Sequence, residues 1–190
     1  MGLKENFERR GFGFLSFESA SQAVDYLCDA CAGETVAFGG SVTLTEIGLY
    51  DRLKERSSCA WHWKQDPADA VLSSEIYITS ANAVCETGEL VNIDGNCNRV
   101  AATMYGRKQV YFVIGKNKLC PDLPSAWDRA RNVAGPRNAQ RLNRNTPCAK
   151  DGVCHDCLSP ECICSVIAVM RKKPTSCKVT VILIDEDLGY

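Results

Sequence analysis

The sequence predicts an α/β fold, with a mostly parallel sheet covered by helices on both faces. Short, continuously apolar segments at 35–38, 75–79 and 109–114 have the length and character of strands that are buried on both sides. Segments with the periodicity of amphipathic helices alternate with them, and this alternation is typical of parallel sheets. Because 190 residues suffice for one core of ordinary size, we expect a single domain over 1–190.

The first elements follow from local signals. An aromatic-rich run at 12–17 predicts a strand, and Ser19 then begins a helix with a capping box. The strand at 35–38 runs directly into a glycine turn, after which Thr43 begins a second capping box. These signals predict strand, helix, strand, turn and helix in that order.

The later elements are equally well marked. A short helix is expected at 99–105, and a longer one at 123–134 should end at Gly135-Pro136 because glycine and proline stop helices. Two further apolar segments, 166–170 and 178–184, predict the closing strands. Their short connection suggests that they pair with each other as a hairpin.

Charge is unevenly distributed along the chain. Residues 1–106 carry 8 basic and 15 acidic groups, whereas residues 107–150 carry 10 basic and 2 acidic groups. The basic segment is either a binding face for an anionic ligand or a set of solvated helix faces balanced by the acidic part. Basic and aromatic residues do not interleave as in nucleic-acid-binding surfaces, so we expect no nucleic acid partner.

The sequence gives no membrane or export signal. Its longest apolar runs are far shorter than the roughly 20 residues of a membrane-spanning helix. The first ten residues mix charges of both signs and contain no apolar core of a secretory leader. We therefore expect a cytoplasmic protein that does not bind a membrane.

The first candidate site is the turn at 38–43. Gly39 and Gly40 let the backbone approach a ligand, and the helix that follows Ser41 and Thr43 presents free N–H groups to an anion. A plain tight turn with a helix cap explains the same residues. The turn is neither a dinucleotide fingerprint nor a phosphate loop, so nothing predicts NAD or ATP.

The second candidate site is the polar stretch at 79–99, directly after a predicted strand. Glu86 and Asp94 are candidate catalytic groups, as nucleophile or general base. Asn82, Asn98 and Arg99 are candidates for orienting a carboxylate or carbonyl group. The alternative is an ordinary loop, because amides, acids and glycines are also common in turns.

The third candidate site is a cysteine-rich loop at 146–164. Cys148, Cys154, Cys157 and Cys164 are candidate metal ligands, because thiolates suit zinc and iron–sulfur clusters. Zinc or an iron–sulfur cluster is therefore the predicted cofactor, with Cys162 as an additional thiol. The alternative is a set of surface thiols or a disulfide without metal.

Several stretches together resemble the LUD-domain family, the lactate-utilization proteins. They are 38–43, 77–83, 86–95, 98–101, 115–118, 134–139, 147–164 and 186–190. The chain departs from the usual family pattern at Cys97, where the family has glycine, and at Cys162, where it has arginine.

The resemblance implies a Rossmann-like fold similar to ribose-phosphate isomerases and coenzyme A transferases. It also implies an accessory subunit or small-carboxylate-binding protein, associated with L-lactate oxidation to pyruvate and with iron–sulfur partner subunits. Lys116, in the matching stretch 115–118, joins the candidate ligand-binding residues. The alternative is a stand-alone enzyme acting on an acyl-CoA or a sugar phosphate, since Glu86 lies in a context similar to the glutamate nucleophile of the transferases. The substrate and the oligomeric state stay open.

Overall fold

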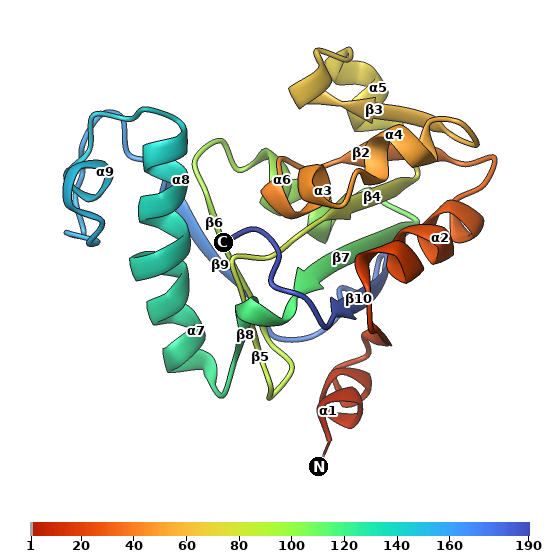
Figure 1. Cartoon of the computed structure of the whole chain (residues 1–190), viewed down its shortest axis with the longest axis horizontal. Coiled ribbons are helices and arrows are strands. Elements are labelled where there is room, and N and C mark those ends of the chain that lie inside the picture. Colours follow the sequence, from red (N-terminus) through yellow and green to blue (C-terminus); the bar gives the residue numbers. More distant parts are fainter. Residues whose placement is uncertain (1) are drawn as a thin grey trace.

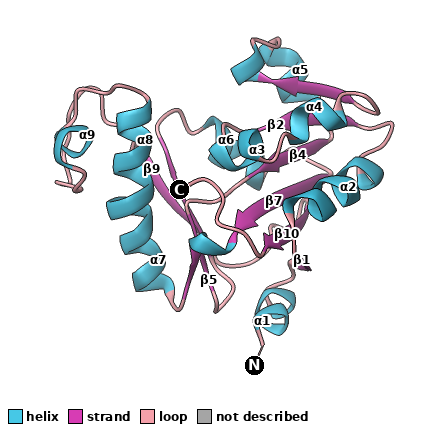
Figure 2. Ribbon diagram, in the orientation of Figure 1, coloured by secondary structure: helices cyan, strands magenta, loops and turns pink. Residues whose placement is uncertain are grey.

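The fold is built on two sheets (Figures 1 and 2). The computed structural model describes residues 2–190. The larger sheet is six-stranded and parallel throughout, with the strand order β1-β10-β7-β4-β2-β3. Its strands are β1 (Gly13–Phe17), β2 (Thr35–Phe38), β3 (Ser58–Trp61), β4 (Ile76–Thr79), β7 (Gln109–Gly115) and β10 (Lys178–Ile184). The predicted α/β class with a mostly parallel sheet is confirmed.

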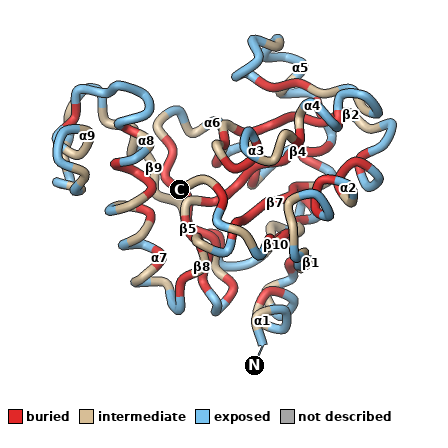
Figure 3. The backbone as a smooth tube through the Cα atoms, in the orientation of Figure 1, coloured by how far each residue is buried: buried red, intermediate tan, exposed pale blue. Residues whose placement is uncertain are grey.

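The central strands are buried on both faces, as their continuous apolar sequences predict (Figure 3). Phe38 of β2 pairs with Ile78 of β4, and Thr79 of β4 pairs with Phe112 of β7. The carboxyl ends of these three strands therefore lie side by side at one edge of the sheet.

Helices α2 (Ala20–Ala30), α3 (Val42–Glu46) and α4 (Leu49–Leu53) cover one face of the larger sheet. Leu27, Leu44 and Leu53 from these helices are fully buried against side chains of the strands. The Ser19 hydroxyl accepts a hydrogen bond from the Gln22 N–H, so the predicted start of α2 is confirmed.

The opposite face carries short helices and the second sheet. The helices are α1 (Leu3–Arg9), α5 (Ala68–Ser73) and α6 (Asn98–Met104). The second sheet has the order β8-β5-β6-β9, from β5 (Ala83–Cys85), β6 (Leu90–Asp94), β8 (Leu119–Cys120) and β9 (Val166–Met170). This mixed sheet could not be predicted from the sequence, because β5 and β8 are too short to give a pattern.

The helix predicted at 123–134 extends well beyond its expected end. It comprises α7 (Leu123–Arg129), a π-helical turn η3 (Ala130–Ala134) and α8 (Gly135–Arg141). Gly135 has helical backbone angles, and a Cβ atom there would lie 3.3 Å from the Ala130 carbonyl oxygen. Pro136 lacks an N–H group, and the π-helical turn just before it changes the hydrogen-bond register locally. The Gly-Pro pair therefore marks a close packing point within the helix, and the prediction that it ends the helix was wrong.

The predicted hairpin of the last two strands is also wrong. Strand β9 pairs antiparallel with β6, whereas β10 lies between β1 and β7 in the larger sheet. The connection is held by the end of α1, because the Lys173 N–H donates to the Arg10 carbonyl and Arg10 Nη1 donates to the Arg171 carbonyl. These hydrogen bonds hold the segment that connects β9 in the smaller sheet to β10 in the larger sheet.

The order of the strands creates a switch point between β2 and β4. After β2 the chain continues to β3 on one side, and after β4 the larger sheet continues to β7 on the other side. Where the connections from two neighbouring parallel strands leave toward opposite sides of the sheet, a crevice opens beyond the carboxyl ends of these strands. Ligands bind in this crevice in α/β proteins. No helix within residues 2–190 is long and apolar enough to cross a bilayer.

Candidate functional site

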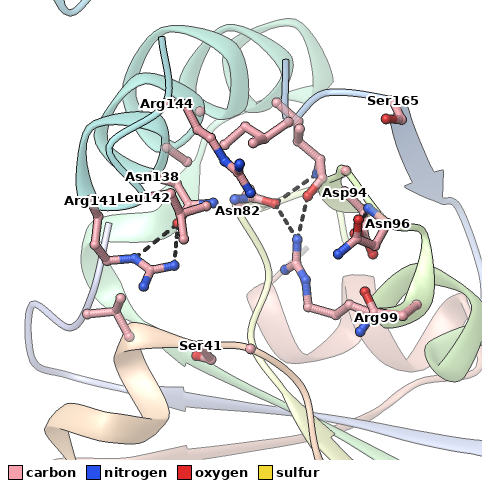
Figure 4. A pocket seen from close by; sticks show the side chains of 18 of the residues that line it. Ser41, Asn82, Asp94, Asn96, Arg99, Asn138, Arg141, Leu142, Arg144 and Ser165 are labelled. Atoms are coloured by element: carbon pink, nitrogen blue, oxygen red, sulfur yellow. Dashed lines mark hydrogen bonds between the residues drawn. The ribbon is translucent and has the colours of Figure 1, made fainter. Parts of the chain in front are cut away.

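A cavity of about 610 Å³ lies at this switch point (Figure 4). Its volume suits a small metabolite. One wall comes from the turns after β2, β4 and β6, and the other from the end of α8 and the segment before β9. The residues that line the cavity include Gly40, Ser41, His62, Trp63, Asn82, Asp94, Asn98, Arg99, Lys118, Arg141, Arg144 and Cys162.

The paired glycines form the corner of the cavity. A Cβ atom at position 39 would lie 2.5 Å from Thr79 Oγ1 and 2.8 Å from the Tyr77 hydroxyl oxygen, so only glycine fits there without a shift. At Gly40 a Cβ atom would lie 3.0 Å from the Trp63 ring. Gly40 lines the cavity directly, as does Ser41. The glycines thus let the carboxyl ends of β2 and β4 come close together.

The cap of helix α3 differs from the prediction. The Ser41 hydroxyl accepts a hydrogen bond from the Leu44 N–H at 3.3 Å, so Ser41 is the N-cap and Thr43 lies inside the helix. The predicted capping box at Thr43 was wrong because Ser41 precedes it with a fitting backbone conformation. Thr43 is fully buried, and its hydroxyl donates to the Leu188 carbonyl. Ser41 therefore lines the cavity, whereas Thr43 is buried beneath the cavity wall.

Asp94 lines the cavity, but its carboxylate is already engaged. Oδ1 accepts hydrogen bonds from the N–H groups of Asn96 and Cys97, and Oδ2 accepts one from Val100 at 2.9 Å. Cys97 has φ of 60°, in the left-handed region. Asp94 thus holds the turn before α6, and glycine would adopt the backbone conformation of Cys97 more easily.

Arg99 extends from α6 to the floor of the cavity. Nη1 donates to the Asn92 Oδ1 at 3.0 Å and to the Ser80 carbonyl, and Nη2 donates to the Asn82 Oδ1 and the Ile93 carbonyl. All four acceptors are neutral oxygen atoms. Burial lowers the pKa of the guanidinium, although arginine remains charged at neutral pH.

Lys118 lies in η2 (Lys116–Lys118) and lines the cavity, whereas the predicted residue Lys116 does not. Lys118 Nζ donates to Thr43 Oγ1 at 2.7 Å and to Ser80 Oγ at 3.0 Å. Burial, with a smaller contribution from nearby arginines, lowers the pKa of Lys118 to about 7. Lys116 instead forms an ion pair with Asp185 at 3.1 Å on the surface.

Arg141, the last residue of α8, and Arg144, just after the helix, complete the cavity. Figure 4 shows Arg141 and Arg144 pointing toward the space that Arg99 enters from the other wall. Arg141 donates to Asn138 Oδ1 at 2.8 Å, and its guanidinium carbon lies 4.8 Å from the centre of the Trp63 ring. Within residues 2–190, the Arg144 guanidinium makes no hydrogen bond or ion pair.

His62 and Trp63 form the rim beside Arg141. The rings of Trp61 and Trp63 stack with their centres 5.4 Å apart, and His62 contacts the edge of Trp63. Burial lowers the pKa of His62, and nearby Asp94 partly opposes this shift. His62 also lines the cavity.

The structure separates Glu86 from the other candidate residues. Glu86 follows β5 at the end remote from Asn82, its side chain is exposed, and it does not line the cavity. Its backbone N–H donates to the Cys120 carbonyl, and its carbonyl accepts from Asn6 Nδ2. The remaining candidates Asn82, Asp94, Asn98 and Arg99 are brought together around the cavity with Gly40 and Ser41.

The cysteine-rich loop forms part of the outer wall. Cys148 lies on α9 (Pro147–Asp151), the Cys154 Sγ accepts from Arg131 Nη2 at 3.4 Å, and Cys162 reaches the cavity. Burial and the proximity of Cys162 raise the pKa of Cys164 to about 12, so its thiol stays protonated at neutral pH.

The cysteines of this loop are all free thiols. Within residues 2–190, no three His, Cys, Asp or Glu side chains are arranged to hold a metal ion. The predicted ligands Cys148, Cys154, Cys157 and Cys164 thus do not fit a bound ion as they stand. Zinc or an iron–sulfur cluster remains a prediction from their spacing.

Three basic residues of the cavity were not among the candidates predicted from the sequence. They are Lys118, Arg141 and Arg144. All three belong to the basic segment 107–150, whose excess charge was the available signal. The segment contributes one wall of the cavity, while other basic residues in it, such as Lys116 and Arg131, pair with surface carboxylates. Residues of this segment therefore divide between the cavity wall and the paired surface, and the binding of an anionic ligand there stays a prediction.

Comparisons with known proteins agree with this architecture. The sequence profile of the LUD domain matches residues 1–184. The crystal structure of a DUF162 family protein from Deinococcus radiodurans is similar in fold, with a TM-score of 0.57, 11% sequence identity and 96% of each chain covered. None of the curated proteins matches the sequence. Because the profile spans nearly the whole sequence, the chain belongs to the LUD-domain family.

Proposed function

We propose that this chain binds a small carboxylate in the cavity at the switch point, through Arg99, Lys118, Arg141 and Arg144. The observation that carries the proposal is a charge imbalance. These four basic residues line the cavity, and within residues 2–190 none of them forms an ion pair with a carboxylate. Arg99 is partly buried, and a buried charge without a carboxylate partner is costly, so a bound anion would stabilise it. Arg141 and Arg144 are exposed, so their guanidinium groups are accessible to the same anion.

The two carboxylates of the cavity do not neutralise these cations. Asp94 accepts three backbone hydrogen bonds, and Glu161 accepts one from the Asn145 N–H at 2.9 Å. Guanidinium groups match carboxylate oxygens in geometry, and the Arg144 guanidinium makes no hydrogen bond within the described residues. Arg144 and Arg141 are therefore the groups that we expect to contact the ligand first.

The family resemblance supplies the biological setting of the proposal. It suggests an accessory or carboxylate-binding role associated with L-lactate oxidation to pyruvate, together with iron–sulfur partner subunits. The alternative, an enzyme that acts on acyl-CoA or a sugar phosphate through Glu86, has less support because Glu86 lies outside the cavity. A binding role requires only the cations and amides that the cavity contains.

Isothermal titration calorimetry with lactate, pyruvate, a sugar phosphate and an acyl-CoA tests the proposal. We expect the small carboxylates to bind, and Arg144→Gln to weaken binding by about tenfold to a hundredfold, because a hydrogen bond to a charged group contributes about 1.5–3 kcal/mol. Arg171→Gln is a matched control, since Arg171 is exposed and lies outside the cavity.

Two results would contradict the proposal. The first is the absence of carboxylate binding at low ionic strength. The second is binding that the double variant Arg141→Gln, Arg144→Gln leaves unchanged. Turnover of an acyl-CoA that is lost in Glu86→Gln would instead favour the alternative function.

A further inference from the structure

Lys118 is an amine held in one position at the centre of the switch point. Lys118 is only 3% exposed, yet it lines the cavity. The two hydroxyls that accept from Nζ belong to Thr43, after β2, and Ser80, after β4. On the third side lies Gly189, where a Cβ atom would be 3.2 Å from Nζ and 2.5 Å from Thr43 Oγ1. The packing therefore fixes the direction of the amine.

The surroundings of Lys118 favour the neutral amine. Within residues 2–190, no carboxylate forms an ion pair with it, and its hydrogen-bond partners are neutral hydroxyls. Arg129 and Arg99 are close enough to disfavour a further positive charge, while Glu46 opposes them in part. The Glu46 carboxylate is itself engaged, because Oε2 accepts a hydrogen bond from the Gly189 N–H at 2.6 Å. A neutral lysine is a nucleophile, and desolvation next to other cations is a known way to produce one.

If Lys118 only stabilised the fold, we would expect an ion pair with a carboxylate, because such a pair offsets the cost of burying the ammonium charge. Here a buried amine lines an electropositive cavity and contacts two hydroxyls that can exchange protons with it. These are the parts needed for reversible addition to a carbonyl group. The surrounding arginines would hold an anionic group elsewhere on the same molecule.

We propose that Lys118 forms an imine with a small carbonyl compound whose anionic group is bound by the arginines of the cavity. The Nζ lone pair attacks the carbonyl carbon, and the carbonyl oxygen takes up a proton to give a carbinolamine. Loss of this oxygen as water, with the remaining amine proton, gives the imine. The hydroxyls of Ser80 and Thr43 are placed to relay these protons. The step is a condensation and consumes no oxidant or reductant. It rests on the proposed function for the anionic group and extends that function to the carbonyl group.

Trapping with borohydride tests the proposal on the unaltered protein. The chain is incubated near neutral pH with pyruvate, or in a parallel arm with glyceraldehyde 3-phosphate, and is then reduced. Intact mass spectrometry is expected to show one adduct, heavier than the protein by the carbonyl compound less one oxygen atom. Peptide mapping is expected to place it on Lys118. The two arms distinguish a carboxylate from a phosphate as the anionic group.

Lys116 provides a matched control within the same turn. It is exposed, paired with Asp185 and outside the cavity, so we expect no selective labelling there. Lys118→Gln should abolish the adduct and Lys116→Gln should leave it unchanged. Ser80→Ala should slow trapping at least severalfold while Lys118 is still present. Because mapping of the unaltered chain identifies the labelled lysine, the test does not depend on whether Lys118→Gln folds.

The outcomes separate this proposal from the proposed function. Calorimetric binding of small carboxylates without an adduct on Lys118 would overturn the imine and leave anion binding intact. An adduct on Lys118 that persists in Arg141→Gln, Arg144→Gln, together with no calorimetric binding, would support the nucleophile and contradict the arginine site. Labelling spread over exposed lysines would also overturn the assignment.

Discussion

Replacement of Lys118 by methionine should stabilise the protein, and the gain should depend on pH. Methionine keeps most of the apolar length of the side chain and removes the amine. In the folded chain the pKa of Lys118 is lowered to about 7, whereas in the unfolded chain it has its ordinary value near 10.5. Folding therefore carries a cost whenever this amine is charged.

The sign and size of the effect follow from proton linkage. Between pH 7 and 10.5 the unfolded chain binds the proton more tightly, so the stability of the native protein rises as pH rises through this range. The two pKa values of Lys118 differ by about 3.5, which corresponds to about 5 kcal/mol of stability at about 1.4 kcal/mol for each pKa unit. From pH 6 to pH 9 the advantage of Lys118→Met should fall by about 2–3 kcal/mol. The lost hydrogen bonds to Ser80 and Thr43 lower the stability of the variant by a constant amount at every pH.

Urea unfolding of both proteins at intervals from pH 6 to pH 9 measures this difference. Groups that titrate in both proteins cancel when the two free energies of unfolding are subtracted. Lys116→Met is the control, and its difference from the unaltered protein should stay small and independent of pH because its ion pair is exposed. A Lys118→Met difference that is constant across this range would refute the lowered pKa.

Three further substitutions test how the cavity is held. Gly39→Ala should lower the free energy of unfolding by about 1–3 kcal/mol in urea unfolding, because the added Cβ would lie 2.5 Å from Thr79 Oγ1. Asp94→Asn should lower it by about 1–3 kcal/mol, since an amide nitrogen replaces one of the oxygens that accept three backbone hydrogen bonds, and circular dichroism should show α6 retained at low temperature. Cys97→Gly should raise the melting temperature, because relief of a left-handed conformation worth about 1–2 kcal/mol exceeds the entropic cost of glycine. Unchanged stability in the first two, or a lower melting temperature in the third, would contradict these assignments.

The sequence was sufficient for the core of the fold because local and tertiary signals agree there. Strands such as β2 and β7 are continuously apolar, and the Ser19 cap lies where its side chain can bond the helix. The errors arose where a local signal was outweighed by tertiary contacts. Gly135-Pro136 continues a helix through a π-helical turn, and the two final strands join different sheets because the end of α1 holds their connection.

The candidate site was predictable only where it follows strands of the larger sheet. The carboxyl ends of parallel strands lie at one edge, so the turn after β2 and the stretch after β4 had to come close together. Glu86 lies away from that edge because β5 leads the chain toward Cys120. Arg141 and Arg144 could not be placed from sequence, since their position depends on the unpredicted extension of α7 into α8.

The two walls of the cavity differ in what holds them. The wall formed by the turns after β2 and β4 is fixed by the larger sheet, where close packing at Gly39 and the buried hydrogen bonds of Lys118 leave little freedom. The opposite wall, with Arg141, Arg144 and Cys162, comes from a helix end and a loop outside that sheet. Arg141 and Arg144 are exposed and Cys162 is half-buried, so these side chains can change at little cost to stability. If the cavity binds an anion as proposed, changes at Arg141, Arg144 or Cys162 should alter which anion is bound, whereas changes at Gly39 or Lys118 should alter stability or the proposed chemistry at the carbonyl group.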